Sequence, residues 1–269
     1  MSKISVVIIT KNEAHNIVGC ISSAKKISND IVIVDSGSTD ATVLLAQREL
    51  VTVKSITWRG YGDARNTGAE FAKNDWILSL DADERITDEL ATAILSINFT
   101  ITNAIYGFRR LNFFGNRKIS HGALAHDRVF RLYHKKYSFW NAVPVHEMLV
   151  GKNPQRQTLR SHAEHYGIRT EDHYMEKKMS YAYLCALKYK QEKKSFVPAL
   201  RICSPVFNFV KAYIFQLGFL DKRIGFIIAR VNANYTRTKY QQLQQLMKED
   251  IGPEQYEFPK NKPVQLFKN

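Results

Sequence analysis

The N-terminal hundred residues alternate between short apolar runs and segments whose apolar residues recur every three or four positions. Such a run predicts a strand that is buried on both faces, and the 3-4 spacing predicts a helix with one buried side. Strands alternating with helices are typical of an α/β fold with a parallel central sheet. The predicted strands are residues 4–9, 31–34, 51–58 and 76–80, and the predicted helices lie at 17–24, 41–50 and around 64–71.

Carboxylates follow two of these predicted strands. Asp81 and Asp83 come directly after residues 76–80, and Asp35 follows residues 31–34. Sheets of this kind bind ligands beyond the carboxyl ends of their strands. Two carboxylates one residue apart can hold a hard divalent cation, which in turn holds phosphate oxygens, although many Asp-x-Asp pairs are only solvated loops. Because a buried strand seldom ends in like charges without a compensating cation, we expect a cation here.

Asp35 has a different expected role. It ends its strand two residues before Gly37, which allows a ligand to approach the backbone closely. An acid at the end of an early strand in a βαβ nucleotide site accepts hydrogen bonds from a sugar hydroxyl or a base N–H. We therefore expect Asp35 to contact a nucleoside.

The middle of the chain predicts two further strands, residues 106–110 and 128–133, which carry two arginines each. Those arginines could hold phosphate groups by bidentate contacts, or they could belong to a solvated strand face. Residues 145–147, Val-His-Glu, follow Pro144 in what we expect to be a loop or a strand end.

Two amphipathic helices are predicted near the C-terminus. Apolar residues recur at helical spacing through 206–220 and again through 224–235, with an Asp-Lys-Arg break at 221–223. We expect no transmembrane span, because Arg201, Lys211 and Asp221 interrupt every long uncharged run. The helices could lie in the headgroup region of a membrane, pack on the rest of the protein, or do both.

Charge is distributed unevenly along the chain, whose formal net charge is +14. Residues 1–100 carry 10 Lys and Arg against 13 Asp and Glu, whereas residues 173–248 carry 14 against 3. This asymmetry favours a basic surface that faces a polyanion, either nucleic acid or anionic lipid. A nucleic-acid surface requires aromatic and basic residues interleaved along a groove, whereas the aromatic residues here fall on helical stripes. We therefore expect a membrane surface and no nucleic acid.

The cysteines and the N-terminus predict a cytoplasmic protein. The cysteines are odd in number and show no Cys-x-x-Cys spacing, which favours a reducing compartment. Met1-Ser2-Lys3 leads directly into the first strand, so we expect no cleavable signal. The three cysteines are Cys20, Cys185 and Cys203.

Four motifs together resemble a known family. They are Val-Val-Ile-Ile-Thr-Lys-Asn-Glu at 6–13, Val-Asp-Ser-Gly-Ser-Thr-Asp at 34–40, Arg65-Asn66, and Leu-Asp-Ala-Asp-Glu at 80–84. Their order and spacing resemble the family 2 glycosyltransferases of GT-A fold. The resemblance implies a Rossmann-like mixed sheet flanked by helices, followed by a helical, basic C-terminal extension. The expected domains are a catalytic domain at 1–165, with a nucleotide-sugar half at about 1–100 and an acceptor half at about 101–165, a helical region at 166–250 and a Pro-containing tail at 251–269.

Within that family, the chain resembles the bacterial lipopolysaccharide inner-core β-1,4-glucosyltransferases, which act on heptose. This closer match rests on residues 145–147 and on Gly-Phe-Leu-Asp at 218–221. It implies UDP-glucose as donor and a lipopolysaccharide or lipooligosaccharide core, a glycolipid, as acceptor. It also implies peripheral association with the cytoplasmic face of the inner membrane. The alternatives are another UDP-sugar on a capsule or polyprenyl-linked acceptor and, more remotely, a basic nucleic-acid-binding protein.

The resemblance also assigns roles to single residues. A Mg²⁺ or Mn²⁺ ion at Asp83 would neutralise the departing diphosphate, with Asp81 binding the ribose or sharing the ion. Glu147 matches the catalytic base of a single-displacement, inverting transfer, and Asp127 is the next candidate. The residues that match the UDP-binding nucleoside pocket are Thr10, Glu13, Asp35 and Arg65.

Two details qualify this assignment. Asp63-Ala64 occupies positions where relatives often carry Gln or Lys, which puts the nucleoside contacts there in doubt. The spacing of His162, His165 and His173 could suggest zinc, but no fourth ligand is apparent, so we expect none.

Overall fold

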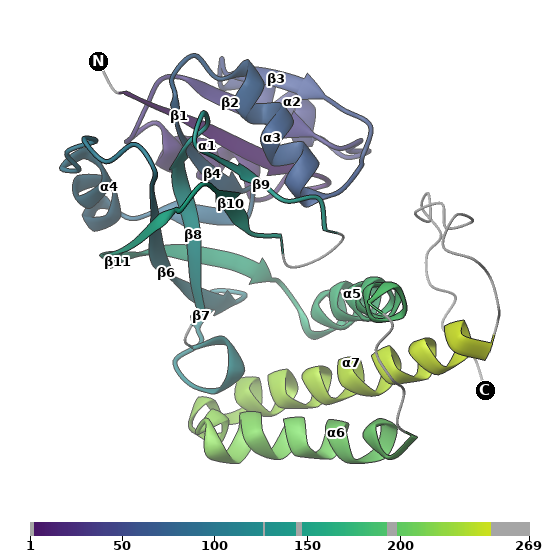
Figure 1. The fold of residues 1–269 in the computed structure, drawn as a ribbon. Helices are drawn as coiled ribbons and strands as arrows, with labels where there is room; N and C mark the ends of the chain where they lie inside the picture. Colours follow the sequence, from purple (N-terminus) through teal and green to yellow (C-terminus); the bar gives the residue numbers. More distant parts are fainter. Residues whose placement is uncertain (1–2, 126, 144–146, 193–197, 249–269) are drawn as a thin grey trace. The chain divides into compact units, whose positions relative to one another are not determined.

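A computed structural model of the protein describes residues 3–125, 127–143, 147–192 and 198–248. The chain divides into two units, one of residues 1–120 and 124–169 and the other of residues 121–123 and 170–269. The helices of the first unit are α1 (Ile17–Ala24), α2 (Thr42–Arg48), α3 (Tyr61–Phe71) and α4 (Asp88–Leu95). Its strands are β1 (Ile4–Thr10), β2 (Ile31–Asp35), β3 (Thr52–Ser55), β4 (Trp76–Asp81), β5 (Glu84–Ile86), β6 (Ala104–Phe114), β7 (Arg117–Lys118), β8 (Asp127–His134), β9 (Ser138–Trp140), β10 (Leu149–Gly151) and β11 (Gln155–Ile168) (Figure 1).

The main sheet of the first unit has the strand order β3-β2-β1-β4-β8-β6-β11-β5, and β7 pairs with β6. Strands β1 to β4 are parallel to one another, as the alternation of strands and helices predicts. Strand β8 runs antiparallel to both of its neighbours, β4 and β6, and β5 runs antiparallel to β11. The expected mixed α/β sheet is therefore confirmed.

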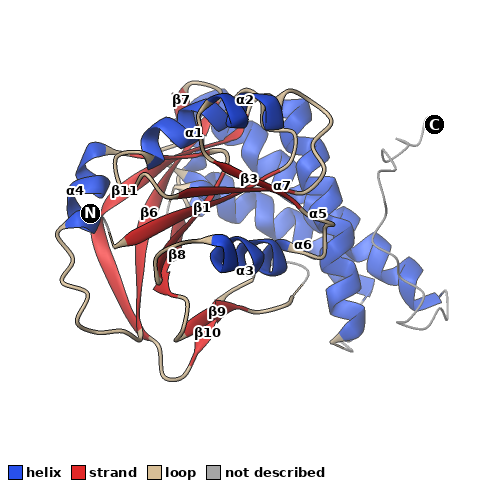
Figure 2. Cartoon of the chain, turned by 90° about the horizontal axis from the view of Figure 1, so that it is seen from above, coloured by secondary structure: helices blue, strands red, loops and turns tan. Residues whose placement is uncertain are grey.

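Helices cover both faces of this sheet, which explains why its central strands are apolar throughout. Along β1, Val6 and Ile8 pack in a core with α1 and α4, whereas Val7 and Ile9 pack in a second core with α3 and the small β9–β10 sheet. Figure 2 shows these layers, with α1 and α2 on one side of the sheet and α3, β9 and β10 on the other. No residue of β1 faces water, so its sequence shows no polar alternation.

Several boundaries differ from the predicted ones. The third strand is Thr52–Ser55 rather than 51–58, and β6 and β8 extend the strands predicted at 106–110 and 128–133. Strand β11 has no clear sequence pattern, because it is interrupted by register shifts and is only partly buried. It continues past residue 165, the expected end of the catalytic domain, and the expected tail at 251–269 lies outside the described residues.

The second unit is helical. It contains α5 (Glu171–Gln191), α6 (Pro198–Val210), a π-helical turn (Lys211–Phe215), a 3₁₀ turn (Gly218–Asp221) and α7 (Lys222–Lys248). Helix α5 packs on α7 through Ala186, Leu243 and Leu246, and the Tyr174 hydroxyl donates a hydrogen bond to Asn232 Oδ1 at 3.0 Å. Helix α6 also packs on α7, where Asn208 Nδ2 donates to Thr236 Oγ1 at 3.0 Å.

The turn between the two C-terminal helices begins earlier than predicted. The chain leaves the helical path at Gln216 and Leu217, and Leu217 has a left-handed backbone with φ of 59°. The turn also includes the expected break at 221–223, because Asp221 ends the 3₁₀ turn and Lys222, with φ of 53°, leads into α7, which runs on to Lys248. Within the described ranges, no single helix is long and apolar enough to cross a membrane, but Arg201–Phe215 and Gly218–Lys248, bent by 73°, meet that criterion as a pair by length and composition.

Candidate active site

The carboxyl ends of β1, β2 and β4 place the predicted residues side by side. Thr10 pairs with Asp35 across β1 and β2, and Ile9 pairs with Asp81 across β1 and β4. Parallel pairing without a register shift thus brings the ends of three predicted strands to one edge of the sheet. Asp81, Asp83 and Asp35 all lie at this edge.

Asp81 is held by arginines from other elements. Its Oδ1 lies 2.5 Å from Arg65 Nη2, and its Oδ2 lies 2.6 Å from Arg131 Nη2, with Arg110 Nη1 at 3.8 Å. Burial raises the pKa of the Asp81 carboxyl, but the charges of Arg131 and Arg65 outweigh burial and hold that pKa well below its usual range. Asp81 therefore stays ionised, with a guanidinium on each oxygen.

Glu84 completes this network and is fully buried. Its Oε2 accepts the backbone N–H of Asp81 at 3.0 Å, and its Oε1 accepts Arg110 Nη1 at 2.9 Å. The acidic run at the end of β4 predicts a bound cation as its compensating charge. For Asp81 and Glu84, side chains of Arg65, Arg110 and Arg131 supply that charge. The inference from charge alone was therefore incomplete, because long-range arginines could not be seen in the local sequence.

Arg65 on α3 connects Asp81 to Glu147. Its side chain is 1% exposed, its Nη1 donates to Ser79 Oγ at 2.9 Å, and its Nε lies 3.5 Å from Glu147 Oε1. The guanidinium also lies over the Trp140 ring, 4.8 Å from its centroid. Arg65, which is predicted to bind the nucleoside, is thus enclosed by protein groups.

The two candidate bases have different surroundings. Glu147 has a side chain that is 14% exposed, and Arg65 keeps it next to the Asp81 network. Asp127 Oδ2 accepts both Nε and Nη2 of Arg110, at 2.9 and 2.6 Å, so this carboxylate is already engaged by a guanidinium of the protein. Glu147 is therefore the better placed base. Its predicted neighbours at 145 and 146 lie outside the described residues.

Asp83 faces an imidazole that the sequence did not single out for this role. Its Oδ2 lies 3.3 Å from His165 Nε2, which antiparallel pairing of β11 with β5 brings to this edge. Asn112 fixes the ring: its Nδ2 donates to the Leu124 carbonyl at 2.7 Å, so its Oδ1 accepts His165 Nδ1–H at 2.5 Å. His165 Nε2 is then directed at Asp83 Oδ2, and a proton or a shared cation between the two atoms would make this contact attractive.

Gly167 lacks a side chain, and the space that a side chain would take is occupied by His165 and Asp83. A Cβ there would lie 2.6 Å from His165 Nε2 and 3.2 Å from Asp83 Oδ2. Among the described residues, no group of three or more His, Cys, Asp and Glu side chains is placed to hold a metal ion. A cation at Asp83 and His165 would therefore complete its coordination with oxygens of a bound molecule, as Mg²⁺ commonly does with phosphates.

The loops after β1 and β2 are tied to each other. Asp35 Oδ2 accepts the backbone N–H groups of Gly37 and Ser38, each at 3.0 Å, which is a sufficient structural role for this carboxylate. Asn12 Oδ1 accepts Thr39 N–H at 2.8 Å, and the Asn12 N–H donates to Ser38 Oγ at 2.8 Å. These hydrogen bonds hold the loop after β1, which carries Glu13, against the loop after β2, which follows Asp35.

Other predicted side chains lie on the same loops. Glu13 Oε2 accepts Asn16 Nδ2 at 2.8 Å. Thr10 Oγ1 and Ser36 Oγ are buried without a hydrogen-bond partner among the described residues, so both remain able to bond a ligand. Ser36 was not predicted, and only its position after Asp35 could have indicated it.

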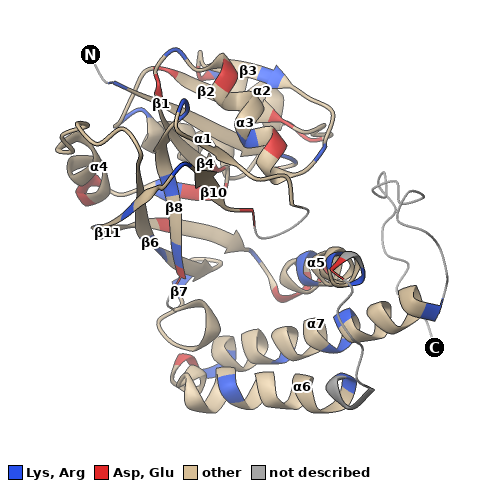
Figure 3. Ribbon diagram, in the orientation of Figure 1, with Lys and Arg blue, Asp and Glu red and all other residues tan. Residues whose placement is uncertain are grey.

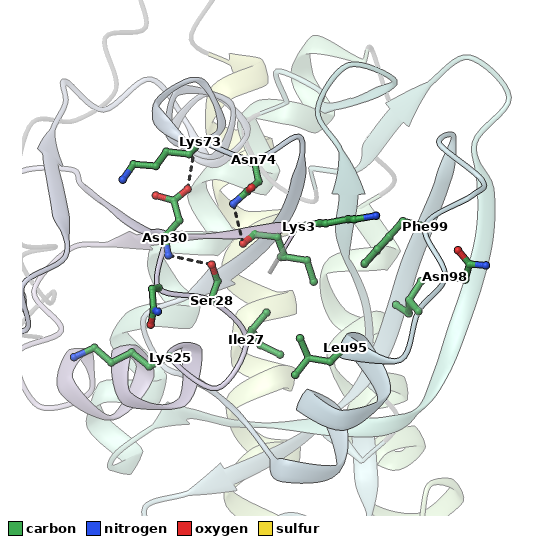
Figure 4. A pocket seen from close by; sticks show the side chains of 13 residues that line it. Lys3, Lys25, Ile27, Ser28, Asp30, Lys73, Asn74, Leu95, Asn98 and Phe99 are labelled. Carbon is green, nitrogen blue, oxygen red and sulfur yellow. Dashed lines mark hydrogen bonds between the residues drawn. The ribbon is translucent and has the colours of Figure 1, made fainter. Parts of the chain in front are cut away.

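A pocket of about 870 Å³ lies elsewhere on the first unit (Figure 4). Lys3, Asp30 and Asn74 line it, and these residues come before or at the starts of β1, β2 and β4. It therefore lies at the amino ends of the strands, away from the acids. None of the candidate residues lines this pocket. The candidate active site therefore lies at the opposite edge of the sheet, at the carboxyl ends of the strands.

Known proteins resemble this chain in sequence. An uncharacterized glycosyltransferase of Rickettsia bellii is 37% identical over 155 residues, 55% of this chain and 52% of that protein, so the chain spans about half of this relative's length. The lipopolysaccharide core biosynthesis glycosyltransferase LpsC of Rhizobium meliloti is 33% identical over 111 residues, 39% of this chain and 40% of that protein.

A solved structure resembles the fold. The mannosyltransferase PcManGT of Pyrobaculum calidifontis, in complex with GDP-Man and Mn²⁺, matches with a TM-score of 0.51 at 12% identity, covering 90% of this chain and 87% of that one. This likeness confirms the expected GT-A fold. The family model described as Glycosyl transferase family 2 matches residues 5–158, a stretch that contains every predicted site residue from Thr10 to Glu147. The chain belongs to glycosyl transferase family 2.

Proposed function

We propose that the protein is an inverting glycosyltransferase that uses a nucleotide-sugar donor. The observation that carries the proposal is the convergence of Asp81, Asp83 and Glu147 at one edge of the sheet, with the buried Arg65 contacting both Asp81 and Glu147. Glu147 comes from a part of the chain distant from Asp81 and Asp83, and the three carboxylates would serve different roles in one reaction. Membership of the family supports the reaction class.

Asp83 and His165 are the residues that would hold a divalent cation. Their facing acceptor atoms, 3.3 Å apart, fit a shared cation, and Asn112 sets the ring orientation that such a ligand needs. When bound, Mg²⁺ or Mn²⁺ would neutralise charge on the departing diphosphate. Both oxygens of Asp81 already face guanidinium groups. Asp81 would therefore position the donor, or share the ion through the side of its carboxylate that faces away from those groups.

Glu147 acts as the general base in this proposal. Its carboxylate takes the proton from the acceptor hydroxyl as that oxygen forms a bond to C1 of the sugar. The bond between C1 and the diphosphate oxygen breaks on the opposite face, so the configuration at C1 inverts. Arg65, with its Nε 3.5 Å from Glu147 Oε1, would hold the carboxylate in place beside Asp81. Base catalysis of this kind contributes about 10²–10⁴-fold to the rate.

We propose UDP-glucose as donor and a lipopolysaccharide or lipooligosaccharide core heptose as acceptor. The sequence at residues 145–147 and 218–221 supports this choice, and the similarity to LpsC, a lipopolysaccharide core biosynthesis glycosyltransferase, supports the core as acceptor. Another UDP-sugar on a capsule or polyprenyl-linked acceptor is the second candidate. The cytoplasmic location expected from the cysteines stays a prediction. Cys20, Cys185 and Cys203, which all lie in the described part of the chain, form no disulfide bond there.

The test is a panel of UDP-sugars assayed with truncated lipopolysaccharide cores, using wild type and Glu147→Gln. Glu147→Gln should lower kcat by two to four orders of magnitude and leave UDP-sugar affinity unchanged, which isolates the loss of the base. Glu70→Gln, an exposed change outside the site, is the matched control. An equal loss of donor affinity in Glu147→Gln would assign Glu147 a structural role, and salt-sensitive oligonucleotide binding without any sugar transfer would overturn the proposal.

A further inference from the structure

Large apolar side chains lie exposed along one part of the second unit. Phe215 is 73% exposed and Ile202 is 69% exposed, and they belong to a series that continues from α6 through the bend into the first turns of α7. The surfaces of soluble monomeric proteins rarely expose so many large apolar side chains in one stretch of chain. We call these residues the apolar edge: Ile202, Val206, Phe207, Ile214, Phe215, Leu217, Phe219, Leu220 and Phe226.

Basic side chains accompany the apolar edge. Lys211, Lys222 and Arg223 are exposed within the same stretch. Residues 198–248 contain eight Lys and Arg but a single acid, Asp221. That carboxylate accepts the backbone N–H of His121 at 2.9 Å and lies 2.8 Å from its ring Nδ1. Figure 3 shows α6 and α7 with Lys and Arg in blue and almost no red.

The second unit holds the apolar edge in a fixed shape. Phe209 and Tyr213 pack against Phe226, with ring centroids 5.8 Å apart in each pair. At the bend, a Cβ on Gly218 would lie 2.6 Å from the Ala212 carbonyl oxygen, so the 3₁₀ turn packs directly against the backbone of the π-helical turn. Helix α6 packs on α7 through the side that carries Asn208, and the residues of the apolar edge stay exposed to solvent.

We propose that the apolar edge inserts into the headgroup region of a bilayer that contains anionic lipid, with Lys211, Lys222 and Arg223 contacting lipid phosphates. A bilayer interface takes up apolar side chains and attracts cations at the same depth, which this stretch offers together. Interfaces between proteins are depleted in Lys, so a protein partner fits the same surface less well. The proposal does not depend on the identity of the donor or acceptor.

The experiment is flotation of the full chain with vesicles of neutral phosphatidylcholine alone or mixed with phosphatidylglycerol. Wild type should bind the anionic vesicles and lose most of that binding at high salt. Lys211→Gln/Lys222→Gln/Arg223→Gln should weaken binding roughly 100-fold, since each of the three basic groups near the surface contributes about a factor of five. Arg230 is left unchanged because it pairs with Glu171.

A second variant, Phe207→Ser/Phe215→Ser, tests insertion separately from charge, and it should weaken binding even at low salt. The charge-matched control is Lys3→Gln/Lys73→Gln/Lys152→Gln, three exposed residues of the first unit, and it should bind like wild type. Equal binding by wild type and both test variants would overturn the proposal. So would a concentration-dependent dimer that Phe215→Ser dissociates, without vesicle binding, because the apolar edge would then join two copies. Since flotation needs no donor, its failure is distinct from failure of the proposed transfer.

Discussion

Gly167→Ala should weaken cation binding at the Asp83–His165 pair without unfolding the protein. The added Cβ would lie 2.6 Å from His165 Nε2, closer than atoms of this kind pack. The ring cannot retreat freely, because Asn112 Oδ1 accepts its Nδ1–H at 2.5 Å. Either that hydrogen bond breaks or the Nε2 lone pair turns away from Asp83.

The size of the effect follows from this choice. Losing the hydrogen bond that orients a ligating imidazole typically costs 10- to 100-fold in metal affinity, which corresponds to about 1.4–2.8 kcal/mol. The contact with Asp83 Oδ2, at 3.2 Å, is tight enough to displace the second ligand slightly as well. We therefore expect the loss of Mn²⁺ affinity to lie in the upper part of this 10- to 100-fold range.

The assay is calorimetric titration of Mn²⁺ into protein saturated with UDP, together with thermal unfolding without metal. Gly107→Ala is the matched control, since its Cβ would also press on neighbours, at 2.8 Å from the Phe130 ring and from the Val129 carbonyl oxygen. Gly107→Ala should lower the unfolding temperature and leave Mn²⁺ affinity unchanged. A folded Gly167→Ala protein that binds Mn²⁺ as tightly as wild type would refute the assignment of this pair as the cation site.

Three further predictions concern activity and stability. Asp83→Ala should abolish transfer, and EDTA should reproduce that loss in wild type; retention of more than about a tenth of wild-type kcat/KM would contradict the metal role. Arg65→Met should destabilise the fold by about 3–5 kcal/mol in denaturant unfolding, because Asp81 loses a buried partner, whereas Asp81→Asn combined with it should cost less than the two changes summed. Burial, with a smaller contribution from Lys177, lowers the pKa of Lys178 to about 8. The unfolded chain therefore binds more protons between about pH 8 and 10.5, and wild-type stability should rise with pH across that window. Lys178→Met should accordingly stabilise the protein at pH 7 by up to about 3 kcal/mol, a gain that fades above pH 8 in unfolding measurements, and a gain independent of pH would count against this reasoning.

The local sequence was enough to predict the parallel half of the sheet and the edge at which the acids lie. Continuous apolar runs such as residues 4–9 and 76–80 can only be satisfied by strands covered on both faces, and parallel strands place their carboxyl ends together. Asp35 and Asp81 had to lie at the same end of the sheet, on either side of β1, once those strands paired. The family resemblance added Glu147, whose position no periodicity could reveal.

Only the tertiary structure decided which charges meet. Arg110 and Arg131 reach Asp81 and Glu84 because β8 inserts antiparallel between β4 and β6, and His165 reaches Asp83 because β11 pairs with β5. These pairings join residues far apart in the chain, and the sequence pattern along β11 is weak because its register shifts twice along β6. Local propensity carries no information about such contacts, since their free energy comes from burial and Coulomb attraction that exist only after the chain has folded.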